Sequence, residues 1–69
     1  MWYDEFVRFI ERAGLTNAAL DSQVRRFNAE RIRTGLSTVT AAAVLRQRSI
    51  ETAVTTKWHR EHPLAFQFA

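Results

Sequence analysis

The sequence of 69 residues has no cysteine, one proline and only two glycines. The absence of cysteine excludes disulfide bonds, thiolate zinc sites and a cysteine nucleophile. The two glycines are too far apart to form a glycine-rich phosphate loop. His59 and His62 stand one helical turn apart, but the sequence offers no third ligand for a metal ion. We therefore predict a protein that is not an enzyme and has no cofactor, metal or small-molecule substrate.

The chain also lacks any long hydrophobic run. No apolar stretch approaches the roughly 20 residues that span a bilayer, so we expect no membrane partner. The first residues are acidic, at Asp4 and Glu5, and lack the basic start of a signal peptide. Together with the absence of cysteine, this favours a reducing compartment, and we expect a cytoplasmic protein.

A chain this short is expected to form one domain, over residues 1–69. It buries only about 60% of its unfolded surface, and its core supplies no more than roughly 3–5 kcal/mol. Without disulfides or a metal, close helix packing or oligomerisation is the expected stabiliser. The fold class predicted is all-α, with two or three helices per chain in a hairpin or bundle that homodimerisation completes.

Gly14 and Gly35 divide the chain into three segments, and each lies where a glycine commonly follows the end of a helix. Apolar spacing predicts helices over about residues 2–13, 16–34 and 38–62, followed by an apolar tail over residues 63–69.

The predicted helices can begin at more than one residue. The second has an N-cap at either Thr16 or Asp21, and the third at Ser37 or Thr38. Helical spacing also pairs Asp4 with Arg8, Asp21 with Arg25 and Glu30 with Arg33. The third helix carries one apolar stripe, made of Val39, Ala43, Ile50 and Val54, with Arg46 inside it.

Eight aromatic side chains are more than three short helices readily cover in a monomer, so a symmetric dimer with a shared core is expected. The first segment is apolar over more than half of its circumference, and the tail alternates apolar residues as an extended docking segment does. The residues predicted to mediate self-association or contacts with a partner protein are Trp2, Tyr3, Phe6, Phe9, Ile10, Leu64, Phe66 and Phe68.

The excess of positive charge is local. Residues 25–48 hold six arginines and one acidic residue, a net charge of +5, whereas the whole chain has +3. Arginine pairs with carboxylates and phosphates through its planar fork, so this segment predicts an electrostatic surface for protein or DNA. The residues are Arg25, Arg26, Arg31, Arg33, Arg46 and Arg48.

A DNA-binding helix-turn-helix is the alternative interpretation. With the turn at Gly14, Ile10 and Gln23 stand where a small and an apolar residue are preferred. With the turn at Gly35, Glu30 and Arg31 occupy positions that should be apolar and small. In this alternative the arginines contact phosphates, as in small transcriptional regulators.

Small size, arginine over lysine and a helical layout characterise the whole chain. In these features it resembles small accessory proteins of phages and mobile elements, including anti-activators that bind a host transcription regulator. The resemblance implies a helical dimer that binds and inhibits or modulates a regulatory protein. We therefore predict a non-enzymatic regulator with a protein partner, and small DNA-binding regulators remain the alternative.

Overall fold

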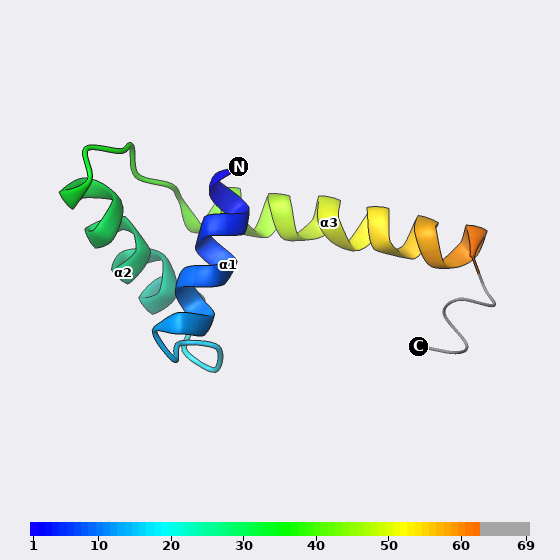
Figure 1. Ribbon diagram of the computed structural model, residues 1–69, viewed down its shortest axis with the longest axis horizontal. Helices are drawn as coiled ribbons and strands as arrows, with labels where there is room; N and C mark the ends of the chain where they lie inside the picture. Colours follow the sequence, from blue (N-terminus) through cyan, green and yellow to red (C-terminus); the bar gives the residue numbers. More distant parts are fainter. Residues whose placement is uncertain (63–69) are drawn as a thin grey trace.

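The computed structural model describes residues 1–62, and this part of the chain contains three α-helices and no strand. Helix α1 spans Trp2–Arg12, α2 spans Leu20–Arg33 and α3 spans Ala41–Glu61. In Figure 1, α1 and α2 lie at one end of the molecule and α3 runs away from them. The all-α prediction is confirmed for the described residues, and the predicted tail over residues 63–69 lies outside them.

Both glycines end a helix in the way their positions predict. Gly14 and Gly35 have φ angles of 70° and 76°, a left-handed conformation that disfavours residues with a Cβ. After α1, the amide of Gly14 donates a hydrogen bond to the main-chain carbonyl of Glu11, and the amide of Leu15 donates one to the carbonyl of Ile10. The pair of hydrogen bonds forms a Schellman motif, which satisfies carbonyls that the end of the helix leaves without partners.

The same arrangement ends α2. The amide of Gly35 donates to the carbonyl of Ile32 at 3.1 Å, and that of Leu36 donates to Arg31 at 2.8 Å. A C-terminal glycine at each of these two ends therefore sets where α1 and α2 stop, because the chain must turn there to satisfy the last carbonyls.

The starts of α2 and α3 differ from the predicted ones. α2 begins at Leu20 after Ala19, so Thr16 lies in the preceding turn, and neither Thr16 nor Asp21 is the N-cap. α3 begins at Ala41, and the Thr40 side chain accepts a hydrogen bond from the Ala43 amide at 3.0 Å. Ser37 and Thr38 are therefore not its cap, because the chain still runs along α2 at those positions.

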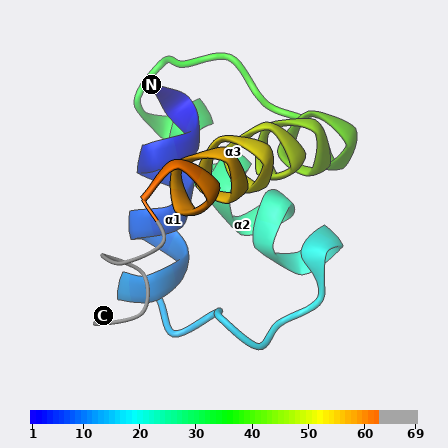
Figure 2. The same cartoon turned by 90° about the vertical axis from the view of Figure 1, so that its right-hand side faces the viewer.

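The core is formed by five buried side chains, with contributions from all three helices: Phe6, Ile10, Val24, Phe27 and Val44. Phe6 meets Phe27 edge to face, with ring centroids 5.2 Å apart. Val44, near the start of α3, is fully buried and is the contribution of the third helix to this core. Figure 2 looks along α3 and shows α1 and α2 beside it. We call α1, α2 and α3 up to Gln47 the head of the molecule.

Two side chains hold the connections between helices against the head. Gln23 is buried, and its Nε2 donates to the Leu15 carbonyl at 2.8 Å. Asn28 makes two hydrogen bonds of 2.8 Å with the main chain of Val39: its Nδ2 donates to the carbonyl, and its Oδ1 accepts from the amide. Because each connection is seven residues long, these bonds satisfy backbone groups that no helix can pair.

Candidate protein-binding surfaces

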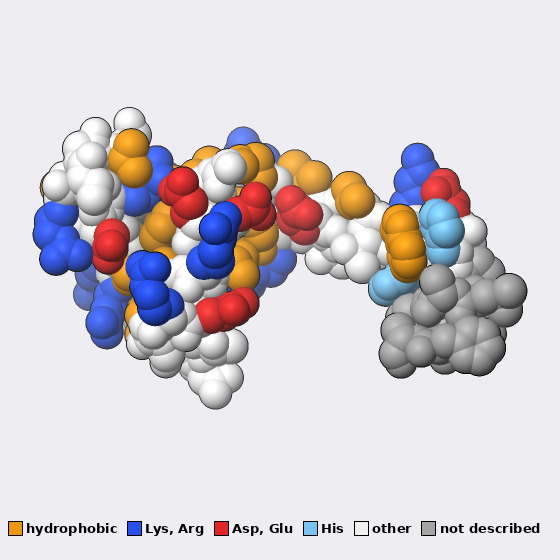
Figure 3. Space-filling view, in the orientation of Figure 1, with side chains coloured by type: hydrophobic (Ala, Val, Ile, Leu, Met, Phe, Trp, Pro, Cys, Tyr) orange, Lys and Arg blue, Asp and Glu red, His pale blue; other side chains and the backbone are white. Residues whose placement is uncertain are grey.

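Beyond the head, α3 continues as an arm over residues 48–61. Every residue from Arg48 to Trp58 is exposed, although this stretch includes large apolar side chains. Ile50 is 49% exposed, Val54 60% and Trp58 47%. Figure 3 shows the arm extending from the head, with hydrophobic side chains along it. The arm therefore has the composition of a packed helix but lacks the packing within residues 1–62.

The apolar stripe predicted on the third helix is covered only at its start, where Val39 packs against the core and Ala43 is half-buried. α3 packs on the head through Val44 and the half-buried Ala41, whereas Ile50 and Val54 of the predicted stripe remain exposed. The reason is that only the first turns of α3 reach α1 and α2. From the middle of the helix onward, no element among the described residues covers the stripe.

A second surface is a groove between α1 and α2 with a volume of about 270 Å³. Its apolar lining comes from Phe9, Phe27 and Leu36, and five charged side chains stand around them: Glu5, Arg8, Arg12, Glu30 and Arg31. The guanidinium of Arg12 lies over the ring of Phe9, 5.8 Å from its centroid. The groove thus combines aromatic rings and arginines, the side chains that dominate protein interfaces.

Arg31 is part of the structure of the head. Its side chain is only 13% exposed, and its guanidinium lies over the ring of Phe27 at 5.5 Å. Its Nε donates to the carbonyl of Ser37 at 2.6 Å, and Nη1 is 3.5 Å from Oε2 of Glu5. Arg31 therefore links α1, α2 and the following connection, and two of its five N–H donors are already used.

The remaining arginines fall into paired and unpaired groups. Arg33 pairs with Glu30 at 3.2 Å, as predicted, and Arg12 lies 4.0 Å from the same carboxylate. Arg8 instead donates from Nε to the main-chain carbonyl of Asp4 at 3.4 Å, so the predicted carboxylate pair does not form. Among residues 1–62, no carboxylate lies within ion-pair distance of Arg8 or of Arg25, Arg26, Arg46 and Arg48.

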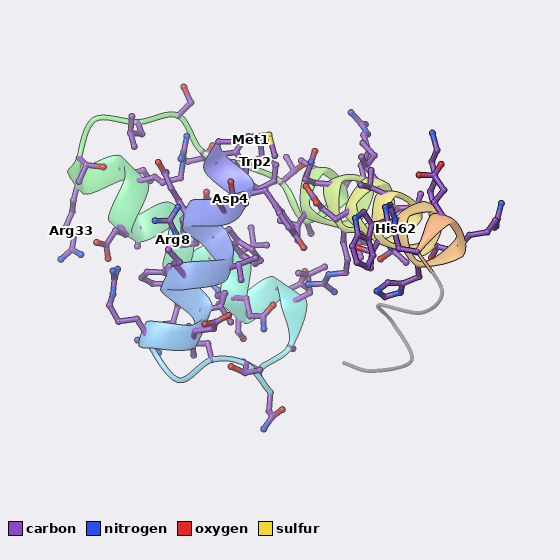
Figure 4. The ribbon with its side chains drawn as sticks, turned by 45° about the vertical axis from the view of Figure 1, so that its right-hand side comes forward. Met1, Trp2, Asp4, Arg8, Arg33 and His62 are labelled. Atoms are coloured by element: carbon purple, nitrogen blue, oxygen red, sulfur yellow. The ribbon has the colours of Figure 1, made fainter. Side chains whose placement is uncertain are left out.

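Figure 4 labels Arg8, Arg33 and His62, which lie at different places along the molecule. Arg8 and Arg33 belong to the head, whereas His62 lies at the far end of α3. The imidazole of His62 stacks on the indole of Trp58 with centroids 4.6 Å apart. Within residues 1–62, the histidines and carboxylates form no group of three that could hold a metal ion.

The apolar and aromatic residues predicted for an interface differ in how far they are buried. Phe6 and Ile10 are core residues of the chain itself, so they present no surface to a partner. Trp2, Tyr3 and Phe9 are half-buried against that core, and Phe9 reaches the groove. The predicted tail positions Leu64, Phe66 and Phe68 lie outside the described residues. Leu36, which the sequence did not place at an interface, also lines the groove, and its amide closes the Schellman motif after α2.

No protein-family model, curated protein or solved structure matches the chain. In the part of the chain that the structure describes, no helix combines the length and apolar character of a membrane span.

Proposed function

We propose that this protein is a non-enzymatic regulator that binds a partner protein, such as a host transcription regulator, and inhibits or modulates it. The observation that carries this proposal is the groove between α1 and α2, whose lining includes the ring of Phe9, with Arg12 over it, and Arg8, which has no carboxylate partner among residues 1–62. Aromatic and arginine side chains grouped at a concave surface are typical of the centres of protein interfaces.

The chemistry of the groove indicates the kind of partner segment. Its volume of about 270 Å³ is below the range of about 300–1,000 Å³ typical of small-molecule sites, which favours a side chain presented by a protein. The apolar lining fits a large apolar side chain, and Arg8 fits a carboxylate next to it. The net charge of +5 over residues 25–48 would attract an acidic partner and raise the association rate.

A photoreactive side chain at position 34, where the exposed Thr34 lines the groove, tests this proposal in host lysate. We expect it to cross-link one protein that the same group at position 52, on the exposed arm, does not capture. The captured protein is then purified, and its affinity is measured for three forms of the chain: wild type, Arg8→Glu and Arg60→Glu. Reversal of charge at Arg8 should weaken binding about tenfold or more, because it replaces a charge-assisted contact with repulsion.

Arg60→Glu is the matched control, since Arg60 is an exposed arginine at the far end of the arm. We expect it to change affinity by less than about threefold. Equal weakening by both variants, or equal capture from positions 34 and 52, would refute the groove as the binding site. A partner whose own activity is unchanged in the complex would refute the regulatory role.

DNA binding is the second candidate, and the four unpaired arginines of α2 and α3 favour it: Arg25, Arg26, Arg46 and Arg48. The geometry of a helix-turn-helix does not support it, because both connections have seven residues where that motif has a turn of about three to four.

A titration of labelled random-sequence duplex DNA at two salt concentrations separates the two candidates. If DNA is the ligand, the double variant Arg25→Ala/Arg26→Ala should lose about tenfold in affinity at low salt and show a slope against salt reduced by about 2. If a protein is the ligand, the wild type should bind this DNA weakly even at low salt. Tight and steeply salt-dependent binding by the wild type would make DNA the preferred ligand.

A further inference from the structure

The arm of α3 has little intrinsic reason to be helical. Most helices in proteins owe their stability to the packing of one face, and residues 48–61 of α3 have no buried side chain within the described chain. The arm also contains β-branched residues, which lower helix propensity: Ile50, Thr52, Val54, Thr55 and Thr56. With every side chain from Arg48 to Trp58 exposed, packing within the described chain does not offset this cost. A helix here therefore needs a partner surface.

Five side chains along α3 follow the spacing of a two-helix seam: four exposed ones on the arm and the half-buried Gln47 just before it. Gln47, Ile50 and Val54 are separated by three and then four residues, and Lys57 and Glu61 continue the same alternation. This is the heptad spacing of a coiled coil, with Ile50 and Val54 as adjacent apolar core positions. The polar residues before and after them lower stability but restrict the registers in which two helices can pair.

We propose that the partner of this seam is the same seam of a second copy of the chain, paired parallel and in register. In a parallel pair, a residue flanking the seam on one helix meets the residue five positions later on the other. Arg46 of one copy then meets Glu51 of the second, and Ala53 meets Trp58 of the second. Two-fold symmetry makes each of these contacts twice.

Both flanking contacts are complementary. Arg46 has no carboxylate partner among residues 1–62, and Glu51 accepts one hydrogen bond, from Gln47 Nε2 at 3.3 Å. The small side chain of Ala53 leaves room for the indole of Trp58, which is 47% exposed in the single chain. An antiparallel pair would instead place like flanks together, Arg46 near an arginine and Glu51 near the other Glu51. The flanking charges therefore favour the parallel pair, although Lys57 and Glu61 of the seam then meet their own copies and weaken it.

This inference goes beyond the proposed function and does not depend on it. The head packs on α3 through Val44, which lies on another side of the helix from Ile50. The groove that contains Arg8 lies between α1 and α2 and takes no part in the seam. A dimer formed through the arms thus leaves two grooves available, one on each head.

The absence of native cysteine makes disulfide trapping a clean test in the full-length chain. In parallel, in-register helices Ile50 faces Ile50, so Ile50→Cys should form a covalent dimer under mild oxidation at least about tenfold faster than Thr52→Cys. Thr52 is the matched control because it is exposed on the opposite side of the arm. An antiparallel pair would cross-link only the mixture of Ile50→Cys and Val54→Cys chains, which would overturn the parallel arrangement.

Light scattering and sedimentation on variants without cysteine provide the second measurement. Val54→Asp should raise the dimer dissociation constant about 100-fold or more, because two apolar side chains leave the seam and two charges replace them. Arg46→Glu and Glu51→Arg should each raise it about three- to tenfold, and the double variant Arg46→Glu/Glu51→Arg should return it to near the wild-type value. Rescue by exchange of the two charges cannot arise from misfolding.

Two results would overturn the inference. One is a wild-type chain that remains monomeric up to millimolar concentration, and the other is a dimer that Val54→Asp leaves intact. Either result leaves the groove untouched, because cross-linking from position 34 is measured separately. Conversely, loss of partner capture at position 34 with an intact, Val54-dependent dimer would refute the proposed function alone.

Discussion

Replacing Phe27 by alanine is expected to lower the free energy of unfolding by about 3–5 kcal/mol. Phe27 is 3% exposed, and its ring contacts those of Phe6 and Phe9 with centroids 5.2 and 5.7 Å apart. A core of five side chains cannot rearrange to fill the space left by a ring. Because a chain of this length has roughly 3–5 kcal/mol of core stability in total, the variant should be largely unfolded at 25 °C.

Urea unfolding followed by far-ultraviolet circular dichroism measures this effect. Ile32→Ala is the matched control, since Ile32 lies on the same helix and is 63% exposed. It should change stability by no more than about 0.5 kcal/mol. Phe27→Leu retains most of the volume and should cost less than the alanine variant. If Phe27→Ala kept a cooperative transition close to that of the wild type, α1 and α2 would not be held together by the ring cluster.

Replacing Asn28 by alanine is expected to cost about 2–3 kcal/mol, the second-largest effect of a single substitution. The side chain makes two hydrogen bonds of 2.8 Å with the main chain of Val39 and so holds the start of α3 against α2. Their loss leaves one amide and one carbonyl of a partly buried segment without partners, which costs more than the net value of the bonds. Asn28→Asp should also destabilise, because a carboxylate cannot donate to the Val39 carbonyl.

The measurements for Asn28 are urea unfolding and amide hydrogen exchange at Val39. Exchange should become faster in both Asn28 variants, because the amide of Val39 loses its acceptor in the alanine variant and the connection loosens in both. Asn17→Ala is the control, since Asn17 is exposed in the connection between α1 and α2. Equal stability of the Asn28 and Asn17 variants would show that the connection is held by apolar contacts alone.

Some of the fold follows from local sequence alone. Gly14 and Gly35 end helices because a left-handed residue is needed there, and that need depends only on neighbouring backbone. The spacing of Phe6 and Ile10 places both on one side of α1, where the core is. The pair Glu30–Arg33 forms because residues three apart on a helix are neighbours wherever the helix lies.

Other features depend on contacts between distant residues. Thr40 is the N-cap of α3 because Asn28, which lies eleven residues before Val39 in the sequence, holds the extended chain at Val39. A run of Ser37, Thr38 and Thr40 contains three good caps, and their residue types do not distinguish among them. The buried role of Arg31 likewise depends on Glu5 and Ser37, which approach it only after the helices pack.

The candidate binding surfaces also have features that the sequence predicts and features that it does not. Their residue types follow from the sequence: a local excess of arginine, an excess of aromatic side chains and an apolar stripe on the third helix. Their locations do not. Phe6 and Phe9 lie three residues apart, yet one enters the core and the other lines the groove, because α2 covers one and only partly covers the other.

By itself, the sequence determines the helical class, the ends of α1 and α2, and the imbalance between apolar side chains and the area three short helices can bury. These properties depend on backbone conformation and composition, which are local or additive. Only the tertiary structure decides which arginines are paired, which aromatic rings are covered, and that α3 passes the head with Ile50 and Val54 exposed. Those outcomes depend on where the helices cross, and that is set by the simultaneous packing of Phe6, Phe27 and Val44.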